Sequence, residues 1–149
     1  MKSLFDTTQA VMDYLNTNMV SLVGKGGITL GIYKDYFPQE NKKVVNLTGS
    51  KTSRTSISVS SELSGSLEYM DIIDVGIRLI VRAEKKKDAW LLMVNADKLL
   101  NLMVRKSLNS EVQLVLCKRN SGPSQFPGFD DGLDYYSALY SCTMRRSDA

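Results

Sequence analysis

The sequence contains no histidine, and histidine is the commonest general base and the commonest metal ligand in proteins. Without it, neither a Ser-His-Asp nor a Cys-His arrangement for nucleophilic catalysis can be built. The two cysteines, Cys117 and Cys142, are too few for a zinc site of the Cys/His type. We expect both to be small buried hydrophobic residues within strands, with a cross-strand pair that oxidises on purification as the alternative.

Clusters of carboxylates are the remaining candidates for chemistry. Asp71 and Asp74 lie close together at the start of an expected strand, where charge also ends a core segment. Asp130, Asp131 and Asp134 gather in an expected loop, but their spacing is not that of an EF-hand. A strand entrance and a solvated turn explain these residues better. We therefore predict no catalytic residues, no metal site, no cofactor and no enzymatic activity.

Length and composition indicate one domain. The chain has 149 residues, of which 43% are hydrophobic and 23% are charged, so residues 1–149 are expected to form a single α+β domain with its own core. A net charge of +3 is well below the dense positive field of a dedicated nucleic-acid binder. Because no apolar run of about 18 residues and no signal-peptide pattern are found, we expect a protein made in the cytoplasm with no membrane partner.

Hydrophobic periodicity predicts the order helix, two strands, long polar arm, strand, helix, two strands. The expected ranges are about 6–23 and 87–105 for the helices, and 28–33, 43–47, 71–82, 111–119 and 134–145 for the strands. Strands that follow one another without regular alternation with helices indicate the α+β class. We predict a mostly antiparallel sheet of four to five strands with two helices packed on one face.

A Ser/Thr-rich segment interrupts this pattern. About half of residues 46–66 are Ser or Thr, and such a stretch buries too little apolar surface to offset the entropy of ordering it. Residues 56–60 alone alternate like a strand. We expect a long mobile loop or an extended β-hairpin arm over about residues 46–70, which docks a partner through Lys51, Arg54, Ile57 and Val59.

The expected helix over 87–105 is apolar nearly all round. Its core stripe comprises Ala89, Leu92, Met93, Ala96, Leu99, Leu100 and Met103. At 100° per residue, Trp90 and Val94 fall on one flank of the outer face, and Leu91 and Leu102 fall on the other. A helix of this kind is covered on both sides. We predict that these four residues form a subunit interface, with burial by another part of the same chain as the alternative.

Three short segments resemble the tail-terminator (tail-completion) proteins of long-tailed bacteriophages. They are a strand that ends in Val-Arg-Ala at residues 77–83, Asp88-Ala89-Trp90 at the start of the next helix, and Leu99-Leu100 near its end. The N-terminal helix, the early proline loop and the closing strand also fit that family's layout. The likeness therefore spans most of the chain.

This resemblance implies a virion structural protein of the tail and neck, made in the cytoplasm of a host bacterium. Such subunits form a homo-hexameric ring that caps the tail tube, contacts the tube protein and presents a surface to the neck or head-completion protein. DNA passes through such a ring without specific binding. Two alternatives remain open: another head–tail connector or minor structural subunit, and a DNA-binding module that uses Lys42, Lys43, Lys51 and Arg54.

Overall fold

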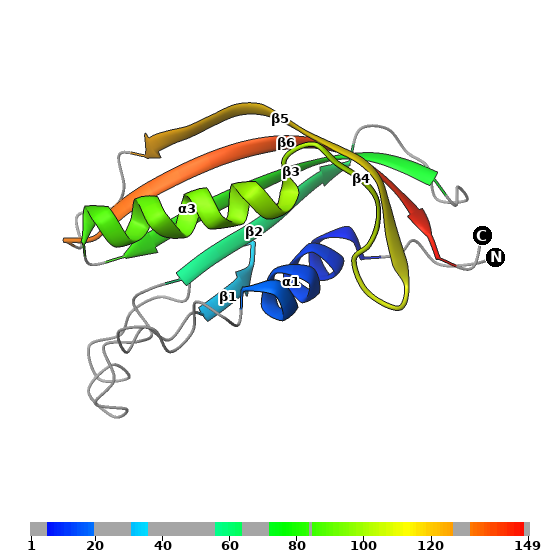
Figure 1. The fold of residues 1–149 in the computed structure, drawn as a ribbon, viewed down its shortest axis with the longest axis horizontal. Coiled ribbons are helices and arrows are strands. Elements are labelled where there is room, and N and C mark those ends of the chain that lie inside the picture. The colour runs from blue at the N-terminus through cyan, green and yellow to red at the C-terminus, as the bar shows by residue number, and fades with distance from the viewer. Residues whose placement is uncertain are drawn as a thin grey trace.

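The computed structural model describes residues 6–19, 31–35, 56–63, 72–83, 85–126 and 132–147. Within these ranges the chain forms one six-stranded mixed sheet and two helices, so the fold is α+β (Figure 1). The predicted class is confirmed, although the sheet has six strands rather than four to five. No helix in the described ranges is long and apolar enough to cross a membrane.

The sheet has the strand order β1-β2-β3-β6-β5-β4. The strands in chain order are β1 (Gly31–Lys34), β2 (Ser56–Leu63), β3 (Ile72–Ala83), β4 (Met103–Ser107), β5 (Val112–Phe126) and β6 (Asp134–Arg146). β1 and β2 pair in parallel, and the other four pairs of neighbours are antiparallel. The first three strands in chain order therefore lie on one side of the sheet and the last three on the other, and the two groups meet at the centre, where β3 pairs with β6.

Helix α1 (Thr7–Asn18) covers the β1–β2 side of the sheet. It begins at Asp6, whose carboxylate accepts a hydrogen bond from the backbone N–H of Gln9 at 2.9 Å and so satisfies an otherwise unpaired donor. The hydroxyl of Thr7 donates to Ser61 on β2 at 3.1 Å, which ties the first turn to the sheet. The expected helix reached residue 23, and residues 20–23 lie outside the described ranges.

Helix α3 (Lys86–Leu100) ends earlier than the sequence pattern predicts, and the chain turns directly into β4. Asn101 leaves the helix with extended dihedrals, and Leu102 has a left-handed φ of 59°. The Asn101 Oδ1 atom accepts the backbone N–H of Arg119 at 3.1 Å, which holds this turn against β5. Met103 and Arg105 are consequently strand residues, and the expectation of a helix to residue 105 is wrong.

The two faces of the sheet differ in their cover. On β3 the alternate residues Ile73, Val75, Ile77, Leu79 and Val81 are buried in one core together with the inner faces of α1 and α3. Both helices lie on this face, as Figure 1 shows. The intervening β3 residues point to the opposite, open face, where Asp74 and Arg78 are exposed. Period-two alternation along the central strands places these two sets of side chains on opposite faces.

The Ser/Thr-rich segment contains strand β2, which lies between β1 and β3. Ile57 and Val59 are fully buried in the core, because they pair in register with Val81 and Leu79 on the helix-covered face. The prediction that they dock a partner is therefore wrong. Lys51 and Arg54 lie outside the described residues, as does the expected strand at 43–47.

The last two strands, β5 and β6, pair along most of their length. β6 runs over Asp134–Arg146, close to the predicted 134–145. β5 extends to residue 126, well beyond the predicted strand end at residue 119. Its ladder with β6 is interrupted between Leu114 and Leu116 and twice between Arg119 and Ser124. These irregularities shift the side-chain alternation, and the Asn, Ser, Gly and Pro residues at 120–124 are typical of a loop, so the sequence pattern ended the strand too early.

Candidate interaction surface

The four apolar residues predicted for the outer side of the second helix are exposed to different degrees. Leu91 on α3 is 51% exposed, and Leu102, which lies in the turn after the helix, is 69% exposed. Val94 is partly buried. The core stripe predicted for this helix is buried at Ala89, Leu92, Met93, Ala96 and Leu100, which orients the helix and leaves Leu91 outside the core.

Trp90 lies between the core and the solvent. Its side chain is 45% exposed, and its ring packs edge-on against Tyr136 of β6 with ring centroids 5.3 Å apart and planes at 60°. An edge-to-face aromatic pair stabilises the fold beyond simple burial. Trp90 therefore anchors α3 to the sheet and also presents apolar surface, so Leu91 is the cleaner probe of an interface.

A second apolar set, which sequence analysis missed, lies on the open face. Val104 of β4 and Leu116 of β5 are register partners, and they are 57% and 46% exposed. Leu114, two positions before Leu116, is buried. The register shift between the two leucines turns them to opposite faces of the sheet. The bulge falls in the continuous apolar run Leu114-Val115-Leu116-Cys117, where alternation cannot tell an exposed residue from a buried one, so no sequence signal separated Leu116 from the core.

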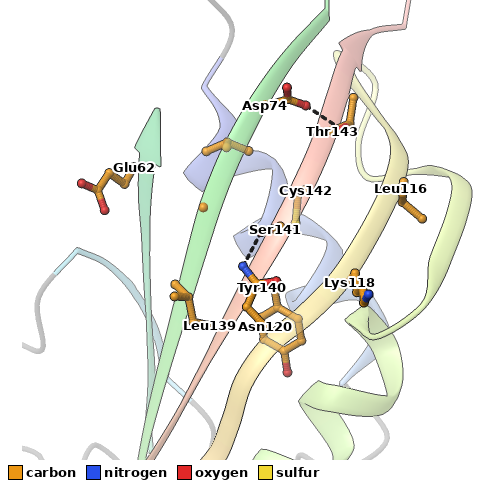
Figure 2. A pocket seen from close by; sticks show the side chains of 12 residues that line it. Glu62, Asp74, Leu116, Lys118, Asn120, Leu139, Tyr140, Ser141, Cys142 and Thr143 are labelled. Carbon is orange, nitrogen blue, oxygen red and sulfur yellow. Dashed lines mark hydrogen bonds between the residues drawn. The ribbon is translucent and has the colours of Figure 1, made fainter. Parts of the chain in front are cut away.

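The same open face has a groove of about 580 Å³ that crosses β2, β3, β6 and β5 (Figure 2). One register row forms its middle, in the order Glu62, Gly76, Ser141 and Lys118. Gly76 has no side chain and Ser141 has a small one, so little side-chain bulk fills the groove at the centre of this row. A Cβ built on Gly76 meets nothing closer than a backbone oxygen at 3.7 Å, so the fold does not require glycine there.

The walls of the groove carry opposite charges. Glu62 on β2 and Asp74 on β3 stand at one side, and Lys118 stands with Leu116 on β5 at the other (Figure 2). The Asp74 carboxylate accepts a hydrogen bond from the Thr143 hydroxyl at 2.7 Å. The groove is therefore bipolar, and its chemistry suits contact with another polypeptide surface more than it suits a single anion or cation.

A polar cluster pins α3 to the sheet from within. Asp97 of α3 accepts hydrogen bonds from the Tyr140 hydroxyl at 2.6 Å and from Arg119 Nη1 at 2.7 Å. Burial, followed by the hydrogen bond to Asp97, raises the pKa of Tyr140 well above its ordinary value. A tyrosine held in its neutral form is a hydrogen-bond donor rather than a base. We interpret the cluster as a structural link that sequence analysis did not identify.

The carboxylates considered from the sequence do not form a cation site in the described part of the chain. No group of three or more Cys, Asp or Glu side chains there is placed to hold a metal ion. Asp74 lies on the open face beside Thr143, and Asp134 begins β6. Asp71, Asp130 and Asp131 lie outside the described ranges.

The two cysteines are brought together by the sheet. Cys117 on β5 and Cys142 on β6 are direct register partners, and their sulfur atoms are 3.1 Å apart. Both side chains are buried, as predicted, and both thiols are free. Spacing along the chain could not reveal this contact, because it depends on how β5 aligns with β6.

Among the described residues, the chain forms an α+β fold in which both helices cover one face of the sheet and leave the other face open. Comparison with known proteins adds no family: no protein-family model matches the sequence, and no curated protein matches it significantly.

Proposed function

We propose that this chain is a structural subunit that assembles with copies of itself into a ring, and that the ring is the tail terminator of a long-tailed bacteriophage. The observation that carries the proposal is a set of exposed apolar side chains, Trp90 and Leu91 on α3 and Leu102 in the turn that follows the helix, of which Leu91 and Leu102 are more than half exposed and Trp90 is close to half. Single exposed apolar residues are normal in monomers. Adjacent large ones on one helix, as at Trp90 and Leu91, favour a protein contact.

The opposed positions of the two surfaces support a ring rather than a symmetric dimer. Leu91 belongs to the helix layer, whereas the groove around Gly76 opens on the other face of the sheet. Contact between one copy's helix layer and the next copy's open face is heterologous. Such a contact repeats from copy to copy until rotation closes it into a ring.

The tail-terminator assignment rests on the resemblance, and the segments that carry it map onto one local unit. Residues 77–83 are the second half of β3, and Asp88-Ala89-Trp90 lie in the first turns of α3. Leu99 and Leu100 end the same helix. In this proposal the ring sits in the tail and neck of the virion, between the tail tube protein and the neck or head-completion protein. It has a structural role and no catalytic one.

The size of the assembly tests the proposal. Native mass spectrometry and electron microscopy of the purified full-length protein, alone and with tail tubes, should detect a ring, with six subunits expected. A monomer under both conditions contradicts the proposal. A ring that does not bind tail tubes but binds another virion component indicates a different head–tail connector. Salt-sensitive DNA binding without a ring indicates a DNA-binding module.

A further inference from the structure

We propose that Cys117 and Cys142 are a site of covalent modification, at which a disulfide oxidant such as oxidised glutathione closes an intramolecular disulfide between β5 and β6. The two residues are register partners on adjacent antiparallel strands, and their thiols are in hydrogen-bond contact at 3.1 Å. Directly opposed residues on such strands lie within the Cα separation that a disulfide spans. This inference does not depend on the proposed function.

The bond would tie the edge of the sheet to its centre. Cys142 pairs with Val75 of β3 on one side and with Cys117 on the other, and Cys117 pairs in turn with Met103 of β4. β4 is one of the two edge strands of the described sheet, and its neighbour in the sheet is β5. A disulfide at this position therefore fastens β5, and with it β4, to the central strands.

The reaction is a balanced thiol–disulfide exchange. The thiolate of one cysteine attacks oxidised glutathione, forms a mixed disulfide and releases one glutathione. The second cysteine, deprotonated in turn, attacks the protein sulfur of that mixed disulfide and releases the other glutathione. The two protein thiols lose two electrons to the oxidant, and their two protons end on the two reduced glutathione molecules.

The fold sets when this reaction can occur. Both side chains are buried, and the hydrogen bond with Cys117, together with burial, raises the pKa of the Cys142 thiol. Few thiolates are present at neutral pH while the sheet is closed, so oxidation is slow. The ladder between β5 and β6 is interrupted on both sides of Cys117, between Leu114 and Leu116 and between Arg119 and Ser121. Local opening of β5 at these interruptions gives the oxidant access.

The test is to expose the full-length reduced protein to oxidised glutathione at neutral and alkaline pH, with and without a non-denaturing concentration of urea. Thiol titration after denaturation and peptide mapping then identify the product. We expect loss of both free thiols in a monomeric chain with a Cys117–Cys142 peptide link, formed faster at alkaline pH and in urea. The Cys117→Ser and Cys142→Ser variants, whose folding is checked by circular dichroism, should give at most a single glutathione adduct.

The stability of the product completes the test. The oxidised chain should resist denaturant better than the reduced chain, with the unfolded-to-folded ratio lowered on the order of a hundredfold. Three results overturn the proposal: two free thiols after incubation with oxidised glutathione in urea, separate glutathione adducts on both cysteines, and disulfides between two copies of the chain. If the oxidised chain is no more stable than the reduced chain, the disulfide does not fasten β5 and β4 to the central strands.

Discussion

The Tyr140 hydroxyl on β6 donates a 2.6 Å hydrogen bond to the Asp97 carboxylate on α3, which also receives the guanidinium of Arg119. Asp97 thus connects the helix to two strands. We expect Asp97→Ala to lower the free energy of unfolding by roughly 3 kcal/mol, because the buried Tyr140 hydroxyl is left without this acceptor. Urea denaturation followed by circular dichroism measures the change.

Tyr140→Phe is the matched control for this link. It removes one hydrogen bond but leaves the Asp97–Arg119 pair, so the loss should be about 1–2 kcal/mol. The double variant should lose less than the sum of the two single variants, because both remove the same contact. Additive losses would mean that the two side chains are not coupled.

The surface on α3 is tested by adjacent leucines. Leu91→Asp should keep the folded circular dichroism signal and abolish the assembly, because a charge at an exposed position costs interface energy but little folding energy. Leu92→Asp should unfold the subunit, because Leu92 is buried in the core and an unpaired carboxylate there is strongly disfavoured. Size-exclusion chromatography with light scattering separates the two outcomes.

Two further variants locate the interface. Trp90→Asp should weaken both assembly and stability, because Trp90 packs against Tyr136. Gly76→Phe should fill the groove on the open face without crowding the backbone. If Leu91→Asp still assembles while Gly76→Phe does not, the copies meet through the open face alone and the role assigned to α3 is wrong.

Two glycines of the sheet should respond oppositely to alanine. Gly122 has a φ of 82°, and a Cβ there would lie 2.5 Å from the backbone oxygen of Ser137. Gly122→Ala should therefore cost at least about 2 kcal/mol of unfolding free energy. Gly76→Ala should be neutral or stabilising by up to about 1 kcal/mol, because the strand backbone there accepts a Cβ. Thermal unfolding of both variants checks this contrast.

The cap of α1 predicts a pH dependence. Partial burial raises the pKa of Asp6, but the Lys34 ammonium and the backbone N–H groups of Gln9 and Thr8 lower it more, so the net pKa is below the ordinary 3.8. A depressed folded-state pKa contributes stability above the unfolded-state pKa. That contribution is lost as the pH falls through the folded value.

Asp6→Asn isolates this charge, because asparagine also caps helices well. The variant should be less stable than the wild-type chain at pH 7, and the difference should shrink below about pH 4 as the wild-type carboxyl is protonated. Lys34→Met is the control, since it removes the ion pair and leaves the cap. A stability difference for Asp6→Asn that stays constant from pH 7 to pH 2 would disprove the assignment.

Elements with strong local periodicity could be predicted from the sequence. The alternation over residues 71–82 predicted β3, which the structure places at Ile72–Ala83. The apolar spacing from Ala89 to Met103 predicted α3 and most of its buried stripe, although the helix ends at Leu100. The exposure of Leu91 followed from the same angular argument. Periodicity is a property of neighbouring residues, so the sequence alone determined the α+β class, these two elements and the residues that α3 turns outward.

Tertiary pairing decided the rest. Ile57 and Val59 became core residues because β2 pairs with β3 in a register that turns both side chains to the helix-covered face, whatever the Ser/Thr content of the segment. Leu116 faces outward because a bulge shifts β5 against β6, and the contact of Cys117 with Cys142 follows from that shifted register. Strand order, register and bulges depend on how residues far apart in the sequence pair with one another, and a local sequence pattern contains no information on the energies of those pairings.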